Sequence, residues 1–303
     1  MQDSQTINAV IAFPLLIFIM GDQGEAAPEK KEEKDAPEKS ENEEVKQENE
    51  SEPVEEEDES PPLIDLSGYF IKPDQFEGIH ILDEKFEKIN GAPNYRQLPG
   101  FPIFGTGQPT EEGMVEILKR AKSGKEKAKV IWFTVRQEPV VYVNGAPYAP
   151  RAPDAPHAHM ETQLNKTELD SVCVHLANVL KKQLKASEDA TIKIHKDKNY
   201  AENPMERIDL EETLKVTSIK DLNSVYKESA EQSGVDLIVV NVPVLEDQAS
   251  SSGVTYDNII NNLKGELAST PCVFSCQMGR GRTTLGMVVA CLIKEIQLTQ
   301  ELK

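Results

Sequence analysis

One stretch late in the chain combines a cysteine, glycines and arginines at a spacing that suits chemistry on phosphate. It runs Phe274-Ser-Cys-Gln-Met-Gly-Arg-Gly-Arg-Thr-Thr284, with five residues between Cys276 and Arg282. A thiolate is the nucleophilic form of cysteine, and a guanidinium can fork two N–H groups onto two phosphate oxygens. Glycines let successive backbone N–H groups turn inward as a nest for the remaining oxygens. The spacing therefore predicts phosphoryl transfer to Cys276.

The residues around this pair have expected roles of their own. The positive end of the helix predicted to begin near Arg282 favours both the bound anion and the thiolate. Thr283 is placed to hydrogen-bond the sulfur and so improve it as a leaving group. Arg280, a second cation in the loop, suits a substrate with several phosphates; the alternative is a solvent-facing arginine that balances a carboxylate. The expected phosphate-binding residues are Gln277, Met278, Gly279, Arg280 and Gly281.

Hydrolysis also needs a group that protonates the leaving oxygen, usually an aspartate on a mobile loop. The candidate is Asp247, which follows an apolar strand predicted over 235–242 and precedes the cysteine by 29 residues. Glu246 is the alternative acid, and both carboxylates can also be read as ordinary solvated loop residues. Residues 248–253, with their serines and glycine, would allow this loop to move.

The elements that must position these groups alternate between strand and helix patterns. Apolar runs predict buried strands over 129–135, 235–242 and 272–275, and an alternating run predicts a strand over 191–195. A hairpin over 140–148 is expected to turn at Asn144-Gly145. Helical spacing predicts helices over 110–122, 164–184, 219–233, 256–267 and 284–296.

This order of elements indicates an α/β fold. Strands separated by helices favour a mostly parallel sheet that is covered by helices on both faces. Ligands of such sheets bind beyond the carboxyl ends of the strands, and Cys276 directly follows the strand predicted over 272–275. The architecture therefore agrees with the chemistry expected of the loop.

The first part of the chain differs in composition from the rest. Residues 1–62 hold 19 acidic and 5 basic side chains, and so carry −14 of the net charge of −19 of the 303 residues. Residues 21–62 cannot bury enough apolar surface to offset their chain entropy, so we expect a disordered acidic segment before a folded domain over 63–303. The apolar run 7–20 is too short for a bilayer span, and a secretory signal is the alternative. Like charges argue against nucleic acid binding.

Cysteine and histidine usage excludes several other classes of site. The cysteines have no paired spacing, which suits a reducing compartment, and we expect Cys173, Cys272 and Cys291 to be core residues. The alternative for Cys272 is a redox partner of Cys276. His157-Ala-His159 has no Cys or carboxylate cluster at ligand spacing, so neither a metal nor another cofactor is expected. Arg136, at a strand end, either lines the pocket or pairs with Glu138 or another carboxylate.

Four stretches together resemble one family. They are Gly91-Ala-Pro-Asn-Tyr-Arg96, Phe104-Gly-Thr-Gly-Gln-Pro109, Arg136-Gln-Glu-Pro139 with Asn144-Gly145, and the cysteine loop. Over roughly residues 85–297 the chain resembles a paladin-type phosphatase domain and, more distantly, the bacterial cysteine phytases. The resemblance implies a tyrosine-phosphatase-like fold and phosphoinositide or inositol phosphate substrates, in the cytoplasm at the face of membranes. Tyr95 and Arg96 then either hold the site or close a turn.

The chain also departs from this resemblance. Paladins are much longer and carry a second such domain, which predicts that the domain ending at Lys303 is truncated at its C-terminus. Ser275 stands where many tyrosine phosphatases place a histidine, so activation of the thiolate would fall to the helix end, the N–H nest and Arg282. The Trp-Pro that accompanies the acid in tyrosine phosphatases is absent.

Two hypotheses about function follow. The first is a metal-independent phosphatase that acts through a phosphocysteine intermediate. The second is a catalytically weak pseudophosphatase that uses the same pocket as a phosphate- or phosphoinositide-binding signalling module. A phosphoprotein partner and a peripheral contact with a membrane are left open in both.

Overall fold

The computed structural model describes residues 64–66, 68–76, 78–124, 128–158, 160, 165–198, 208–242, 244 and 253–301. All of them belong to a unit that spans Glu59–Lys303. The acidic segment, its apolar run 7–20, and the candidate acids Glu246 and Asp247 lie outside the described residues. No helix within the described ranges is long and apolar enough to cross a bilayer.

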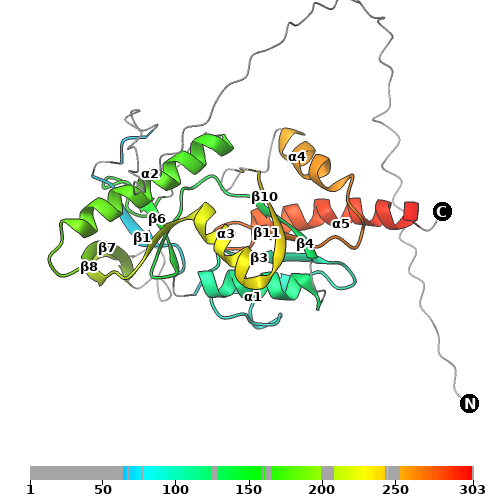
Figure 1. Ribbon diagram of the computed structural model, residues 1–303, viewed down its shortest axis with the longest axis horizontal. Coiled ribbons are helices and arrows are strands. Elements are labelled where there is room, and N and C mark those ends of the chain that lie inside the picture. The colour runs from blue at the N-terminus through cyan, green and yellow to red at the C-terminus, as the bar shows by residue number, and fades with distance from the viewer. Residues whose placement is uncertain are drawn as a thin grey trace, which may run out of the picture. The chain divides into compact units, whose positions relative to one another are not determined.

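Strands and helices alternate along the chain (Figure 1). The strands are β1 (Phe70–Pro73), β2 (Arg96–Gln97), β3 (Ile103–Thr106), β4 (Ala128–Thr134), β5 (Val141–Val143), β6 (Ala146–Arg151), β7 (Thr191–Lys198), β8 (Ile208–Lys215), β9 (Ile219–Asp221), β10 (Val235–Asn241) and β11 (Cys272–Ser275). The helices are α1 (Glu111–Lys122), α2 (Lys166–Lys185), α3 (Leu222–Ser233), α4 (Gly253–Leu263) and α5 (Gly281–Glu301).

A five-stranded sheet forms the centre of the unit, in the order β10-β4-β11-β3-β2. Its first four strands are parallel, and β2 alone is antiparallel to its neighbour. In this register Ser275 lies opposite Thr134 on one side and Thr106 on the other. The strands thus end together at one edge, and the residue after Ser275 is Cys276. The prediction of a mostly parallel sheet is confirmed.

Helices cover both faces of this sheet because alternate residues of its buried strands point to opposite sides. Val130 and Trp132 of β4 pack with apolar residues of α1 and α3. Ile131 and Phe133 pack with residues of α4 and α5 on the other face. Phe133 also stacks on Phe274 of β11, with ring centroids 4.7 Å apart. The strand that leads into Cys276 is therefore held from both sides.

A second sheet is antiparallel and has the strand order β1-β6-β5-β9. Its β5–β6 hairpin turns at Asn144 and Gly145, whose φ values of 51° and 79° fit the predicted two-residue turn. β7 and β8 form a separate two-stranded sheet. One face of the second sheet packs with α2 and β7 in an apolar cluster.

Several element boundaries differ from the predictions. The helix predicted over 219–233 begins at Leu222, because Asp221 caps it by accepting from the Ser224 N–H at 3.0 Å, and the preceding residues form β9. β8 was not predicted. Ile208, Leu210 and Leu214 do alternate with polar residues there, but Glu212 interrupts the pattern and most of the side chains are exposed. The predicted last helix starts earlier and ends later, as α5. The predicted helix 256–267 is displaced toward the N-terminus, as α4.

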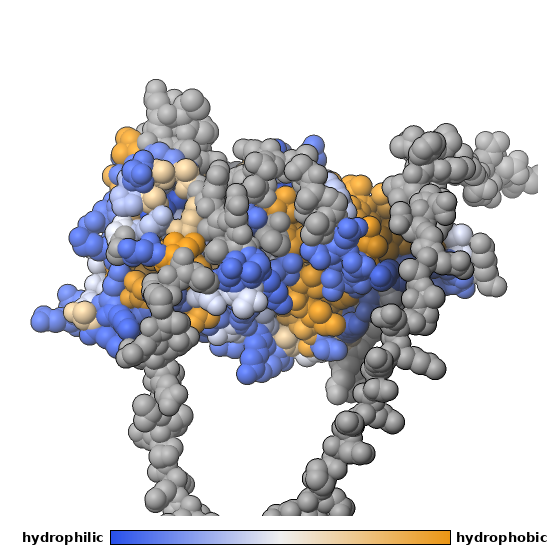
Figure 2. All heavy atoms as spheres, turned by 90° about the horizontal axis from the view of Figure 1, so that it is seen from above, coloured by the Kyte–Doolittle hydropathy of each residue, from blue (hydrophilic) through white to orange (hydrophobic). Residues whose placement is uncertain are grey.

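Apolar side chains also reach the surface on the outer side of α5. Val288, Leu292 and Ile296 follow one another at four-residue steps and are 51%, 62% and 52% exposed. Figure 2 shows hydrophobic residues gathered on the half of the molecule that holds α4 and α5. The described residues leave this stripe of α5 uncovered.

Candidate active site

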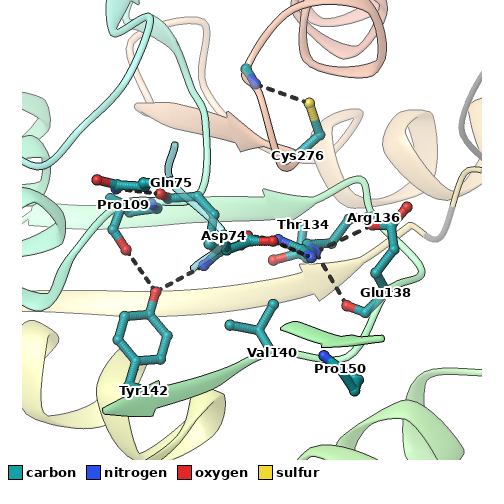
Figure 3. Close-up of polar contacts among 12 residues, drawn as sticks. Asp74, Gln75, Pro109, Thr134, Arg136, Glu138, Val140, Tyr142, Pro150 and Cys276 are labelled. Atoms are coloured by element: carbon teal, nitrogen blue, oxygen red, sulfur yellow. Dashed lines mark hydrogen bonds and ion pairs between the residues drawn. The ribbon is translucent and has the colours of Figure 1, made fainter. Parts of the chain in front are cut away.

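The loop between β11 and α5 holds Cys276 in a buried position, with 3% of the residue exposed. Its Sγ accepts a hydrogen bond from the Gly279 N–H at 3.2 Å (Figure 3). It accepts a second from the Thr283 hydroxyl at 3.1 Å. Both donors stabilise a negative charge on sulfur, which is the form that attacks an electrophile. The predicted contact of Thr283 with the sulfur is therefore present. Thr283 also lies within 3.3 Å of the Thr106 carbonyl, its other acceptor.

Three carbonyl groups of the loop are held from outside. The Gln277 carbonyl accepts from the Gln108 N–H at 2.8 Å. The Met278 carbonyl accepts from Asn94 Nδ2 at 2.7 Å, and the Gly279 carbonyl accepts from Arg96 Nη1 at 2.6 Å. Since a planar trans peptide points its N–H away from its carbonyl, these contacts turn the three following N–H groups toward Cys276. That arrangement is an N–H nest suited to an anion.

The stretch that contains Gly107 packs against the loop backbone to backbone. Gly279 has a φ of +75°, and a Cβ there would lie 2.2 Å from the Gly107 nitrogen. A Cβ on Gly107 would in turn lie 2.6 Å from the Gln277 carbonyl oxygen. Both positions therefore require glycine, for conformation at one and for space at both.

Arg96 and Tyr95 take different roles, although they are neighbours in sequence. Arg96 also donates to the Thr284 hydroxyl at 2.8 Å, so it clamps the loop to the start of α5. Burial lowers the pKa of Arg96, and the charge of a Cys276 thiolate opposes that shift. Tyr95 instead stacks near Phe104 in the core, where burial raises its pKa to about 12. Arg96 thus holds the site, and Tyr95 is a core residue.

Arg282 lies at one end of a chain of charged side chains that runs through Glu138 and Arg136 to Asp74. Its Nη1 donates to Glu138 Oε1 at 2.8 Å and to the Val244 carbonyl at 3.0 Å. Glu138 Oε2 is 3.3 Å from Arg136 Nε, and Arg136 Nη1 donates to Asp74 Oδ2 at 2.6 Å (Figure 3). Burial opposes the charge of Arg136, but the carboxylates of Asp74 and Glu138 raise its pKa above its ordinary value. Of the two interpretations of Arg136, the ion pair is the one observed.

The remaining predicted residues stand as follows. Arg280 is exposed, and no ion pair joins it to the described part of the chain. The Ser275 hydroxyl accepts from Trp132 Nε1 at 2.8 Å, so this position supplies a buried hydroxyl behind the nucleophile. Cys173 and Cys272 are buried as expected, and Cys291 is half-buried. No cluster of three metal-ligating side chains occurs among the described residues.

Sequence reasoning missed Asp74, Asn94 and Gln108 as supports of the site. Asn94 and Gln108 lie in stretches that carried the resemblance, which was the only signal for them. Asp74 had none, although it is completely buried. Asp247, the predicted acid, lies outside the described residues and stays a prediction.

A cysteine that accepts two hydrogen bonds, an N–H nest and a guanidinium, all placed beyond the carboxyl end of a parallel strand, define the class of cysteine-dependent phosphatase loops. A family model for PTP-like phytases, with the description "Inositol hexakisphosphate", matches residues 133–294, more than half of the chain. The chain belongs to the PTP-like phytase family.

Curated relatives that match the chain carry the name Paladin. Human Paladin is 25% identical over 226 residues, which cover 73% of this chain and 22% of that protein. Paladin of Gallus gallus is 25% identical over 229 residues, covering 70% of this chain and 24% of the relative. The chain thus spans about a quarter of the length of these relatives.

Solved structures were also matched. A PTP-like phytase from Bdellovibrio bacteriovorus is 20% identical, with a TM-score of 0.41, and the match covers 67% of this chain and 65% of that one. The tandemly repeated protein tyrosine phosphatase like phytase from Mitsuokella multacida is 16% identical, with a TM-score of 0.46. This match covers 78% of this chain and 37% of that one.

Proposed function

We propose that the chain is a metal-independent phosphatase that hydrolyses phosphate monoesters through a phosphocysteine intermediate. The observation that carries this proposal is the pair of hydrogen bonds from Gly279 and Thr283 to the Cys276 sulfur, inside a loop whose carbonyls are tied outward. A structural turn has no need to surround a buried thiol with donors. Membership of the PTP-like phytase family supports the same chemistry.

The first step transfers the phosphoryl group to sulfur. The Cys276 thiolate attacks phosphorus in line, an S–P bond forms, and the P–O bond to the alcohol breaks. The N–H nest and Arg282 stabilise the charge on the equatorial oxygens. Asp247, or Glu246 in its place, gives its proton to the departing alcohol oxygen.

The second step regenerates the enzyme. The same carboxylate takes a proton from water while the water oxygen attacks phosphorus, and the S–P bond breaks. Inorganic phosphate leaves, and the electron pair returns to sulfur as a thiolate. The Thr283 hydroxyl, 3.1 Å from the sulfur, lowers the cost of that charge and so makes Cys276 a better leaving group.

We assign phosphorylated inositols, free or as phosphoinositide headgroups, as the substrate class. The description of the matching family, "Inositol hexakisphosphate", supports this assignment. Arg280, an exposed residue of the loop itself, would bind a phosphate next to the one that is cleaved. Such substrates agree with a cytoplasmic protein that meets membranes peripherally.

Phosphate binding without turnover is the second candidate function, and one contact favours it. Arg282 is already held by Glu138 and by the Val244 carbonyl, so one edge of its guanidinium is engaged before a substrate arrives. Glu138 in turn serves two arginines, which leaves it poorly suited to donate a proton. Under this reading the pocket docks on phosphate groups and releases them unchanged.

Phosphate release by the full 303-residue chain distinguishes the two functions. The substrates are inositol hexakisphosphate, phosphoinositide in vesicles and a phosphotyrosine peptide, each assayed with the Cys276→Ser variant alongside. We expect turnover by the wild type alone, fastest on the inositol phosphates. A folded wild type that binds these ligands and releases no phosphate would leave the binding module as the function.

A further inference from the structure

Arg151, the last residue of β6, lies on the face of the antiparallel sheet that meets the active site. Directly opposed residues of paired strands share a face, and Arg151 is opposite Phe70 while Ala149 is opposite Lys72. Tyr142 of β5 is opposite Pro147 and so lies on that same face. The other face, with Tyr148 and its neighbours, packs into the cluster that contains α2.

Tyr142 connects this face to the residues around the cysteine loop. Its hydroxyl accepts from Gln108 Nε2 at 2.8 Å, and Gln108 Oε1 accepts from Arg136 Nη1 at 3.2 Å. The Gln108 N–H is also the group that holds the Gln277 carbonyl of the cysteine loop. Figure 3 shows Arg136 between Cys276 on one side and Pro150, the residue before Arg151, on the other.

Arg151 is buried, and its guanidinium forms no ion pair with a carboxylate of the described residues. Arg151 is 5% exposed, and its one hydrogen bond to the described residues is donated by Nη1 to the neighbouring Pro150 carbonyl at 3.0 Å. A guanidinium carries five N–H donors, so most of its donors have no acceptor among the described residues and are available to a ligand. Burial lowers the pKa of Arg151, although the nearby carboxylates of Asp74, Glu138 and Asp197 oppose that shift.

Each carboxylate near Arg151 is already engaged by another cation. Asp74 accepts from Arg136 at 2.6 Å. The Glu138 carboxylate accepts from Arg282 and forms an ion pair with Arg136. Asp197 accepts from Lys72 at 2.7 Å and lies 2.9 Å from His157 Nδ1. Within the described residues Arg151 therefore has no carboxylate of its own, and a buried charge left in that state is costly unless a ligand completes it.

We propose that Arg151 binds a second phosphate group of the substrate, while the scissile phosphate occupies the cysteine loop. A phosphate dianion supplies the oxygens that the guanidinium fork lacks, in the bidentate geometry that arginine favours. Arg151 is then a specificity residue that selects polyphosphorylated over monophosphorylated substrates. This inference rests on the proposed function for turnover, but its binding component stands independently.

The test compares Arg151→Gln and Arg151→Lys with the wild type on p-nitrophenyl phosphate and inositol hexakisphosphate. We expect Arg151→Gln to lower kcat/KM for inositol hexakisphosphate by about tenfold or more, mainly through KM, because a charge-assisted hydrogen bond is lost. The value for p-nitrophenyl phosphate is expected to stay within about twofold, since one phosphate does not reach Arg151. Arg151→Lys keeps the charge without the fork, so an intermediate loss is expected. Arg120→Gln, on the surface of α1, is the matched control and leaves both values unchanged.

A binding measurement separates this inference from the proposed catalysis. In a Cys276→Ser background, calorimetric titration follows the affinities for inositol hexakisphosphate and inorganic phosphate. A loss confined to inositol hexakisphosphate upholds the role of Arg151 even if the wild type proves inactive. Equal losses for both ligands, or a lower Tm with unchanged affinities, would show that Arg151 is structural and overturn the proposal. If Arg151→Gln does not fold, Arg151→Lys decides: unchanged preference for inositol hexakisphosphate overturns it.

Discussion

The Arg282 guanidinium rests on the Glu138 carboxylate, with Nη1 and Oε1 2.8 Å apart and both side chains buried, at 9% and 4% exposure. The other Glu138 oxygen lies 3.3 Å from Arg136. One carboxylate thus orients the guanidinium expected to bind phosphate and neutralises the strand-end arginine behind it.

Replacing Glu138 by Gln removes the charge that two arginines share. Breaking a buried ion pair on one side leaves uncompensated charge, so we expect the free energy of unfolding to fall by about 3 kcal/mol. Urea unfolding of the full chain measures the change. Glu116→Gln, which removes a surface partner of Arg120, is the control and is expected to cost less than about 1 kcal/mol. Equal effects for the two variants would contradict a structural role for the buried pair.

Thr283→Ala removes the hydroxyl that contacts the Cys276 sulfur. If thiolate departure limits the second step, the phosphocysteine should accumulate, and turnover should fall by about 10- to 100-fold, the value of one hydrogen bond to a charged group. Rapid-quench assays would detect a burst of alcohol release before slow phosphate release. Thr283→Ser retains the hydroxyl and is expected to restore turnover. Loss of the burst together with turnover would instead assign Thr283 to the first step.

Arg96→Met leaves the Gly279 carbonyl and the Thr284 hydroxyl without their buried donor. The Gly279 carbonyl is buried, whereas Thr284 is exposed to solvent. An unsatisfied buried acceptor costs about 1–3 kcal/mol, so the loop is expected to loosen and Tm to fall. Amide hydrogen exchange across residues 276–281 measures the loosening, and iodoacetamide alkylation reports the reactivity of Cys276. Unchanged exchange in an inactive variant would mean that Arg96 does not act through the loop backbone.

Gly279→Ala tests the close contact between the loop and the stretch around Gly107. The new Cβ would meet the Gly107 nitrogen at 2.2 Å, and the φ of +75° adds backbone strain. We expect destabilisation of about 2 kcal/mol or more and loss of phosphate binding. Gly265→Ala, with no atom within 4 Å of the new Cβ, should change stability by less than about 1 kcal/mol. Comparable effects at both glycines would refute the packing argument.

The Asp209 carboxylate predicts a pH dependence of stability. Burial works to raise its pKa, but hydrogen bonds from Lys72 and His195 outweigh burial and hold the pKa below 3.8. Because the folded value is the lower one, this stability is fully present above about pH 4 and is lost as the pH falls through the folded pKa. Asp209→Asn should therefore lower Tm at pH 6, with a difference that shrinks below pH 4. A constant difference across that range would rule out this linkage.

Much of the fold was predictable because periodicity and local capping determine it. The buried strands β4 and β11 are continuous apolar runs, and the Asn144-Gly145 turn carries its own conformational preference. β8 escaped prediction because its alternation of apolar and polar residues is interrupted at Glu212 and most of its side chains are exposed. The start of α3 was misplaced because Asp221 caps the helix inside a run that reads as helical throughout.

The sequence by itself determined the cysteine loop, since the sulfur, its two donors and the first turn of α5 lie within eight consecutive residues. Such contacts follow from local backbone geometry. Only the tertiary structure decided which residues hold the loop in place and which charged side chains surround it. Arg96 reaches Gly279 across 183 residues, and Asp74 reaches Arg136 across 62. Single polar side chains leave no periodic trace, so their partners emerge only when the sheets bring distant segments together.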